Sequence, residues 1–410
     1  MKKVVVFILA SFLVVSGLAG CASRSADDAE GKVKIEFFQY KSEAKATFDE
    51  LIKKFEMENP GIDVVQSNPP DAETVLKMRV VKREIPDVMG IGANFTFANL
   101  ANAQIFEDVT NNDLLKDIQP AYIQMLKDVS GLEKVYAVPF AANASSVIYN
   151  KDMFKELGIE VPTTWDEFIE AAETIKAAGK IPFYFTFKDA WTTLPSYNAL
   201  AANTQGGQFF KELKKEHTTF AESHKEAAGK FMQLMEYGHK DQYGKAYSDG
   251  NIAFANGKAA MYLQGIWAIP EIKKANPDIN LGVFPYPVTD VPGESKLVSG
   301  VDLLLAFSSR SEHPEEAKKF VEFLLADENM KTYINQQNAF SARKGVIQED
   351  PVLEGLKPSF EKGALLDFPD HYVPIAVGLD KQLQVLAHNK DVNQFLKTLD
   401  KEWTKVQERQ

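Results

Sequence analysis

The chain has 410 residues, of which 45% are hydrophobic and 25% are charged, a balance that is ordinary for a globular protein. That length supports about two domains, each able to bury a core of its own. The formal net charge is −11, and so acidic a chain argues against binding to nucleic acid and against electrostatic docking on anionic lipid.

The N-terminal residues have the pattern of an export signal. Lys2 and Lys3 precede an apolar run over residues 4–15, which is too short for a typical membrane span. Residues 18–21 read Leu-Ala-Gly-Cys, which resembles a lipobox. We therefore expect residues 1–20 to be removed as a lipoprotein signal peptide, with lipid attached to Cys21. An ordinary secretory signal with a chance cysteine is the alternative.

Cys21 is the only cysteine, so the mature chain has neither disulfides nor thiol catalysis. Export without disulfides is typical of a bacterial surface protein with a large core. Residues 21–31 are small and polar, which predicts a flexible tether. Because two or more acyl chains anchor a protein stably, we expect the outer face of the cell membrane, or the periplasm in a cell with two membranes.

Hydrophobic periodicity predicts an α/β lobe at the start of the mature chain. Residues 33–37 alternate as a strand, residues 48–55 follow as an amphipathic helix, and residues 62–65 make the next strand. This βαβ unit implies a parallel sheet covered by helices. Residues 86–90 are expected to form a third strand, and residues 99–106 a helix.

A capped helix follows the strand predicted at residues 136–140. Thr164 and Glu167 form a capping box, in which a hydroxyl and a carboxylate accept from two otherwise unpaired backbone N–H groups. Apolar residues then recur at helical spacing, and Gly179 is placed at the left-handed end of the helix. Trp165 lies inside the capping motif, and we expect it to serve packing.

The second half of the chain continues the alternation of strands and helices. Residues 181–185 predict a strand, and residues 252–257 with 259–263 read as helix, turn and strand. Residues 298–307 form a further apolar strand. Beyond a loop at residues 341–345, we expect a mostly helical remainder.

Three stretches of the chain resemble the signature of the family 1 extracellular solute-binding proteins, the receptors that feed sugars to ABC importers. The first is the order of residues from 136 to 179. The second is the run Phe-x-x-Gly-x-Ala-Ala-Met at residues 254–261, followed by Gly265 and Trp267. The third is an apolar strand ahead of Pro-Glu-Glu-Ala at residues 314–317. The likeness is closest to the branch that binds multiple sugars and raffinose-type oligosaccharides.

The resemblance implies an α/β fold of the two-lobed, type II periplasmic-binding-protein kind, in which each lobe is a mostly parallel sheet covered by helices and a hinge joins the lobes. It also implies that the chain crosses between the lobes near Phe140, near Gly300 and within residues 341–345. The expected N-terminal lobe is then residues 32–140 and 300–342, and the C-terminal lobe residues 141–299 and 343–410.

Ligands of open α/β sheets bind beyond the carboxyl ends of the strands, so two facing lobes predict one shared cleft. Sugars present C–H faces that pack on flat aromatic rings, and hydroxyls that need fixed donors and acceptors. The candidate ligand-binding residues either follow predicted strands or belong to a compact aromatic and polar loop near residue 370. They are Gln39, Tyr40, Lys41, Asn94, Phe95, Trp191, Gln264, Trp267, Asp302, Asp370 and His371.

Each candidate also has a purely structural interpretation. The tryptophans fit a core, and Asp302 fits a bond to backbone near a crossing. Asn94 fits a turn, because asparagine tolerates left-handed geometry. Asp370 and His371 fit a solvated loop. Lys41 is the weakest candidate, because a lysine that opens a helix is usually solvated.

Sequence motifs of common enzymes are absent, including nucleotide-binding glycine loops, zinc-protease motifs and the nucleophile elbow. The six histidines lack metal-ligand spacing, and we expect neither a metal nor a cofactor. We expect a monomeric receptor, not an enzyme, that binds an oligosaccharide and delivers it to ABC permease subunits. The resemblance leaves α-galactosides and α-glucosides open. An exported glycoside hydrolase or lyase, and a surface adhesin lipoprotein, are the alternatives.

Overall fold

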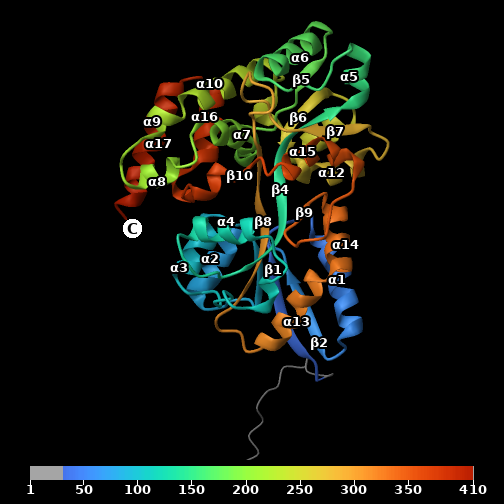
Figure 1. Cartoon of the computed structure of the whole chain (residues 1–410), viewed down its shortest axis with the longest axis vertical. Helices are drawn as coiled ribbons and strands as arrows, with labels where there is room; N and C mark the ends of the chain where they lie inside the picture. The colour runs from blue at the N-terminus through green and yellow to red at the C-terminus, as the bar shows by residue number, and fades with distance from the viewer. Residues whose placement is uncertain (1–30, 410) are drawn as a thin grey trace, which may run out of the picture.

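Two long strands, β4 (Val138–Asn150) and β8 (Leu297–Phe307), run through both lobes of the protein (Figure 1). The computed structural model describes residues 31–409. Nearly every residue of the two strands is buried, because helices and neighbouring strands cover both faces. β4 and β8 pair antiparallel from Val138 opposite Leu305 to Ala144 opposite Ser299.

The N-terminal lobe is built on a sheet with the strand order β2-β1-β3-β8-β4. In it β1, β2 and β3 are mutually parallel, and only β8 runs against the others. Its strands besides β4 and β8 are β1 (Val33–Gln39), β2 (Ile62–Ser67) and β3 (Val88–Ile91), and its helices are α1 (Lys45–Glu58), α2 (Ala72–Lys82), α3 (Phe95–Asn102), α4 (Pro120–Ser130), α13 (Pro314–Leu325) and α14 (Asp327–Gln337).

The C-terminal lobe repeats this plan with β4 as the one antiparallel strand. β5 pairs parallel with β6, and β4 lies antiparallel between β6 and β7. The strands are β5 (Ile181–Phe183), β6 (Ala259–Gly265), β7 (Leu281–Phe284) and the short β10 (Leu365–Leu366), which pairs with β8. The short β9 (Phe340–Ser341) pairs with β4 at Ala141 and Ala142, in the sheet of the N-terminal lobe. The helices are α5 (Lys151–Leu157), α6 (Trp165–Ala177), α7 (Leu194–Thr204), α8 (Phe209–Lys214), α9 (Phe220–Ser223), α10 (Lys225–Leu234), α11 (Tyr247–Ala255), α12 (Ile269–Ala275), α15 (Lys357–Glu361), α16 (Leu379–Asn389) and α17 (Val392–Gln407). In each lobe, therefore, the strand that opposes its neighbours is one that crosses between lobes.

Each lobe has its own hydrophobic core. One core draws on residues 35–142 and 301–346, and the remaining buried clusters draw on residues 144–298 and 353–403. Val346 packs in the first core although it lies beyond the expected end of that lobe. We therefore propose that the first connection leaves the N-terminal lobe after Ala142 and the third after Val346, with the second, near Gly300, as expected from the sequence.

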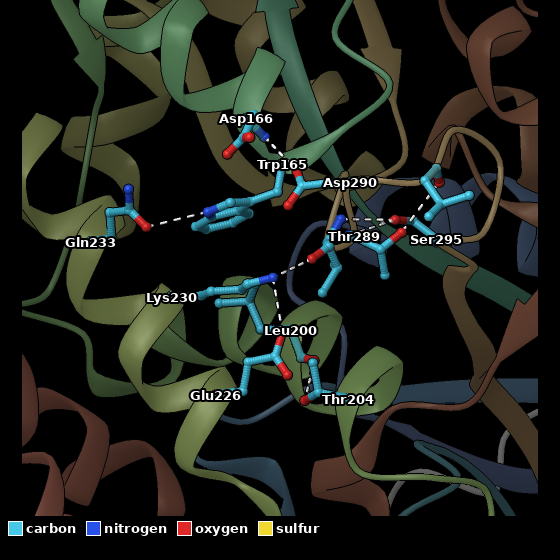
Figure 2. A network of polar contacts seen from close by, with 12 residues as sticks. Trp165, Asp166, Leu200, Thr204, Glu226, Lys230, Gln233, Thr289, Asp290 and Ser295 are labelled. Atoms are coloured by element: carbon cyan, nitrogen blue, oxygen red, sulfur yellow. Dashed lines mark hydrogen bonds and ion pairs between the residues drawn. The ribbon is translucent and has the colours of Figure 1, made fainter.

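The predicted capping box is present at the start of α6. The Thr164 hydroxyl accepts from the Glu167 N–H at 3.3 Å, and the Glu167 carboxylate accepts from the Thr164 N–H at 3.2 Å. Figure 2 shows the buried Trp165 next in the chain, whose ring N–H donates to Gln233 at 3.2 Å. The Lys230 ammonium lies 5.0 Å from the centre of the indole. Trp165 therefore serves packing, as predicted.

The same network ties the start of α6 to the loop that contains Thr289 and Asp290 (Figure 2). The Trp165 N–H donates to the Thr289 carbonyl at 3.0 Å, and the Asp166 N–H donates to Asp290 at 2.9 Å. These backbone donors are the ones that a helix leaves unpaired at its start. The loop therefore completes the N-terminus of the helix.

One helix begins earlier than the sequence pattern predicts. The helix expected at residues 99–106 is α3, Phe95–Asn102, because the Asn94 side chain accepts from the Thr96 and Phe97 N–H groups and starts the helix there. Phe106 is extended and forms a bridge with Ser308.

Among the helices of residues 31–409, none combines the length and apolar character needed to cross a bilayer.

A candidate ligand cleft between the lobes

A cleft of about 610 Å³ lies between the two lobes, within the size range of small-molecule sites. Side chains of both lobes and of the crossing strand β4 line it. From the N-terminal lobe come Tyr40, Lys41, Ser42, Glu43, Gly92, Asn94, Phe95 and Asp302, from β4 comes Asn143, and from the C-terminal lobe come Asp189, Trp191, Leu194, Pro195, Asn198, Tyr247, Ser248, Trp267, Phe368, Asp370, His371, Val373 and Ile375.

A pair of bulges in the β4–β8 ladder places Asp302 at the cleft. Ala141 pairs with Leu303 and Ala142 with Val301, so Asp302 is an extra residue on β8 at that point. An extra residue of this kind bends the strand and redirects a side chain, which is common beside binding sites. A compensating shift on β4 falls at Phe140.

Asp302 organises the polar wall of the N-terminal lobe. The Lys41 ammonium lies 2.5 Å from the Asp302 carboxylate and 3.2 Å from that of Glu43. The Tyr40 hydroxyl donates to the Asp302 carbonyl at 2.7 Å and to its carboxylate at 3.0 Å. Tyr40 and Lys41 directly follow β1, as the prediction from strand ends requires.

Electrostatics fix the charge state of this wall. Burial by itself lowers the pKa of Lys41, but the carboxylates of Asp302 and Glu43 outweigh it and hold that pKa well above its usual value. Burial, and then Asp302, raise the pKa of Tyr40. At neutral pH the wall therefore presents an ammonium, a neutral phenol and fixed carboxylate oxygens.

The facing wall of the C-terminal lobe is largely aromatic. Trp191 lies in the 3-10 segment η2 (Ala190–Thr193), is 39% exposed, and packs 4.9 Å from the ring of Tyr247. Trp267 lies in η5 (Ile266–Ala268), directly after β6. A Cβ at Gly265 would stand 2.0 Å from the Trp267 ring, so only glycine lets the indole lie against the strand end. The Trp267 ring N–H is buried without a partner among the described residues.

The segment η7 (Pro369–Tyr372) carries an ion pair. The Asp367 carboxylate lies 3.1 Å from His371 Nδ1 and accepts from the Tyr372 hydroxyl at 2.9 Å. A Cβ at Gly300 of β8 would come within 2.1 Å of that carboxylate, so the glycine makes room for it. Asn198 of α7 donates to Asp370 at 2.8 Å and accepts from its N–H at 3.2 Å.

The pKa values of His371 and Asp370 are both raised, but for different reasons. Burial by itself lowers the pKa of His371, but the adjacent Asp367 carboxylate outweighs it, and the pKa is raised to about 9. Burial raises the pKa of Asp370. At neutral pH His371 is therefore an imidazolium, held between two acidic side chains.

The structure brings nearly all the predicted site residues to one cleft. Gln264 and Gln39 are the exceptions among the eleven candidates. Gln264 is buried, and its amide nitrogen lies 3.5 Å from the Thr192 carbonyl, beneath the Trp191 segment. Gln39 is also buried, and it bonds to Gln66 at 2.8 Å. Ligand contact by the nine residues that line the cleft stays a prediction.

Asn94 lines the cleft, but its amide is already engaged. Its oxygen caps α3, and its nitrogen donates to Glu73 at 2.6 Å. Phe95 is the first residue of that helix. The structural interpretation of Asn94 therefore accounts for its hydrogen bonds.

Several cleft residues were missed at the sequence level. Asp189 lies two residues before Trp191, and its carboxylate accepts from the Tyr247 N–H at 2.7 Å, which sets the start of α11. Asn143 belongs to β4, and its side-chain oxygen is buried without a partner among the described residues. Two signals in the sequence mark these residues. Asp189 is a polar residue beside a predicted aromatic, and Asn143 is a lone asparagine in an apolar strand.

In residues 31–409 no group of His, Cys, Asp and Glu side chains is arranged to hold a metal.

Two lobes joined by crossing strands around a cleft that both of them line define a ligand-binding protein of the two-lobed class. Residues 40–331 match the family of bacterial extracellular solute-binding proteins, and the chain belongs to this family. It is similar to the multiple sugar-binding protein of Streptococcus mutans serotype c, with 36% identity over 345 residues that cover 81% of this chain and 80% of the relative.

Solved structures of similar proteins agree with this assignment to the family. The chain is similar to the solute-binding protein RafE in complex with raffinose, at 32% identity and a TM-score of 0.80, over 91% of this chain and 99% of that one. It is also similar to a sugar transporter protein of Bacillus licheniformis in complex with stachyose, at 26% identity and a TM-score of 0.75, over 91% and 100% of the two chains. These likenesses confirm the two-lobed fold.

The ion pair of His371 predicts a loss of stability at alkaline pH. Because the folded-state pKa of about 9 exceeds the ordinary value near 6.5, the contribution is complete below about pH 6.5 and disappears as the pH rises through 9. Between pH 7 and pH 10 the free energy of unfolding should fall by about 2 kcal/mol more in the wild type than in His371→Gln.

Urea denaturation across this pH range measures the difference. His388→Gln, a change at an exposed histidine of α16, is the matched control and should keep the wild-type slope. Equal slopes for wild type and His371→Gln would contradict the assignment of the ion pair.

Proposed function

We propose that the protein binds an oligosaccharide in the cleft between its lobes and delivers it to the transmembrane subunits of an ABC importer. One observation carries the proposal: fixed donors and acceptors at Tyr40, Lys41 and Asp302 face the rings of Trp191 and Trp267 across one cleft. Flat apolar faces opposite fixed polar groups suit the alternating C–H and hydroxyl surfaces of a sugar.

The names of the relatives support a particular sugar class. One is a multiple sugar-binding protein, and the two solved relatives hold raffinose and stachyose. We therefore favour an α-galactoside of the raffinose series over an α-glucoside. No cofactor and no metal is needed for such binding.

Closure of the lobes would couple binding to delivery. A sugar that contacts both walls stabilises the closed form, because only that form offers both sets of contacts. Micromolar affinity corresponds to about −8.2 kcal/mol, which stacked rings and several hydroxyl bonds supply. The permease would then recognise the closed shape.

The other two functions considered fit the site less well. A glycoside hydrolase needs two carboxylates free to act on the glycosidic bond, whereas Asp302 is held by Lys41 and Asp370 by Asn198. If the protein were a surface adhesin, we would expect Trp191 and Trp267 to be buried in separate lobe cores, whereas both line the cleft. We therefore propose binding without a chemical step.

The location is also part of the proposal. Cys21 lies outside the described residues, and we propose that it carries the lipid that holds a monomeric receptor at the outer face of the cell membrane, or in the periplasm of a cell with two membranes. Residues 21–31 would serve as the tether.

Raffinose should raise the thermal stability of the protein and be recovered intact. At a free concentration 100 times the dissociation constant, binding to the native state alone adds about 2.7 kcal/mol to the free energy of unfolding. A thermal-shift scan together with chromatography of the sugar checks both points. Release of galactose or sucrose would instead support the hydrolase.

Trp267→Ala should weaken raffinose binding by about 2 kcal/mol or more, close to thirtyfold, because the indole supplies a stacking face. Isothermal titration calorimetry measures the change. Tyr243→Ala removes a half-exposed ring outside the cleft and serves as the control. Unchanged affinity in a folded Trp267→Ala protein would remove this residue from the site.

Cys21→Ser should release the protein from the cell surface, because the lipid-bearing thiol is lost. Cell fractionation and labelling with a radioactive fatty acid measure anchoring directly. Persistent labelling or membrane retention of Cys21→Ser would contradict the proposed anchor.

A further inference from the structure

A second groove, of about 500 Å³, continues the space between the lobes beside α11 and α12. Ser42, Glu43, Tyr247 and Ser248 line both the groove and the cleft, so the two spaces share a boundary. The residues that line only the groove are Asn251, Ile252, Glu271, Lys274 and Ala275. The groove therefore extends the cleft in one direction, past Glu43 on one lobe and Tyr247 on the other.

Close packing fixes α11 along this groove. A Cβ at Gly250 would lie 2.3 Å from Thr186 and 2.6 Å from the hydroxyl of Tyr262 on β6, so only glycine lets the helix approach the strand this closely. Tyr247 and Asn251 lie one helical turn apart and so on the same face of α11. Both residues line the groove, which therefore runs beside a rigidly held helix.

The boundary between groove and cleft is formed by side chains of opposite lobes. Tyr247 of α11 and Glu43 of the N-terminal lobe line both the cleft and the groove. Glu43 is itself held by Lys41 at 3.2 Å. The ring of Tyr247 packs 4.9 Å from Trp191. A chain that leaves the cleft here would pass between an aromatic ring and a fixed carboxylate.

The groove offers polar side chains that suit the hydroxyl groups of a sugar. The Asn251 side chain is 3% exposed, and its oxygen has no hydrogen-bond partner among the described residues. Buried polar groups normally have partners, so an unpaired amide oxygen in a groove marks a place for a donor. Glu271 and Lys274, which lie 3.8 Å apart, add an acceptor and a donor at the far side.

We propose that this groove binds the sugar units by which a neutral oligosaccharide longer than a trisaccharide extends beyond the cleft. The inference rests on the proposed function and adds the length of the preferred ligand. Hydroxyls of the added units would donate to Asn251 and Glu271, and their chain would pass Tyr247. Affinity therefore increases with chain length until the groove is filled.

Raffinose, stachyose and verbascose, with three, four and five sugar units, test this by isothermal titration calorimetry. The wild type should bind verbascose about tenfold more tightly than raffinose. Ala275→Trp places an indole in the groove from an exposed position at the end of α12, away from the cleft lining. This variant should bind raffinose as the wild type does and lose the tenfold gain.

Ala177→Trp is the matched control, because Ala177 is likewise the exposed last residue of a helix, α6, and lines neither space. It should keep the full dependence on chain length. Asn251→Ala provides a second variant, expected to weaken verbascose binding several-fold with raffinose binding retained.

Two results overturn the inference while leaving the proposed function intact. One is equal affinity of the wild type for all three sugars, and the other is a gain that survives in Ala275→Trp. Failure of the wild type to bind any of the three would instead contradict the proposed function, and the inference with it.

Discussion

The antiparallel pairing of β4 and β8, with an extra residue on each strand, is the constraint on which the rest of the structure depends. Both strands belong to the sheets of both lobes, so each lobe is built outward from the same ladder. The shift at Asp302 interrupts regular pairing between the lobes and directs a carboxylate toward the cleft. The same irregularity therefore interrupts the ladder and supplies a polar anchor for the cleft.

The two walls of the cleft are stiff for different reasons. On the N-terminal lobe, an ammonium held between two carboxylates keeps Tyr40, Lys41 and Asp302 in place. On the C-terminal lobe, glycine at position 265 lets Trp267 lie against the strand end. Preorganised walls lose little conformational entropy when a ligand binds, which favours affinity without a large contact area.

Local patterns predicted much of this fold and part of the site. Apolar runs marked the start of β4, which continues ten residues beyond the predicted strand, and nearly all of β8. Aromatic residues after strands led to Trp191 and Trp267. Gln264 shows the limit: a strand alternates its faces, so a residue at a strand end turns toward the core as readily as toward the cleft. The amide of Asn94 caps helix α3, a role that competes with the predicted contact to a ligand.

The residues at the boundary between the lobes could not be predicted from local sequence patterns. Glu43 and Tyr247 belong to different lobes and come together only through the approach of those lobes. Nothing in the spacing along the chain records that approach. Pairs that act across two domains therefore need the folded molecule to be recognised.

Gly300 of β8 lies where β8 meets both β4 and the segment that contains Asp367. It lies opposite Asn143 in the ladder, and the space beside it holds the carboxylate that retains His371. A larger residue there would disturb lobe geometry and ligand recognition in the same step. The shape of the ladder and the position of the His371 ion pair are therefore coupled through this single glycine.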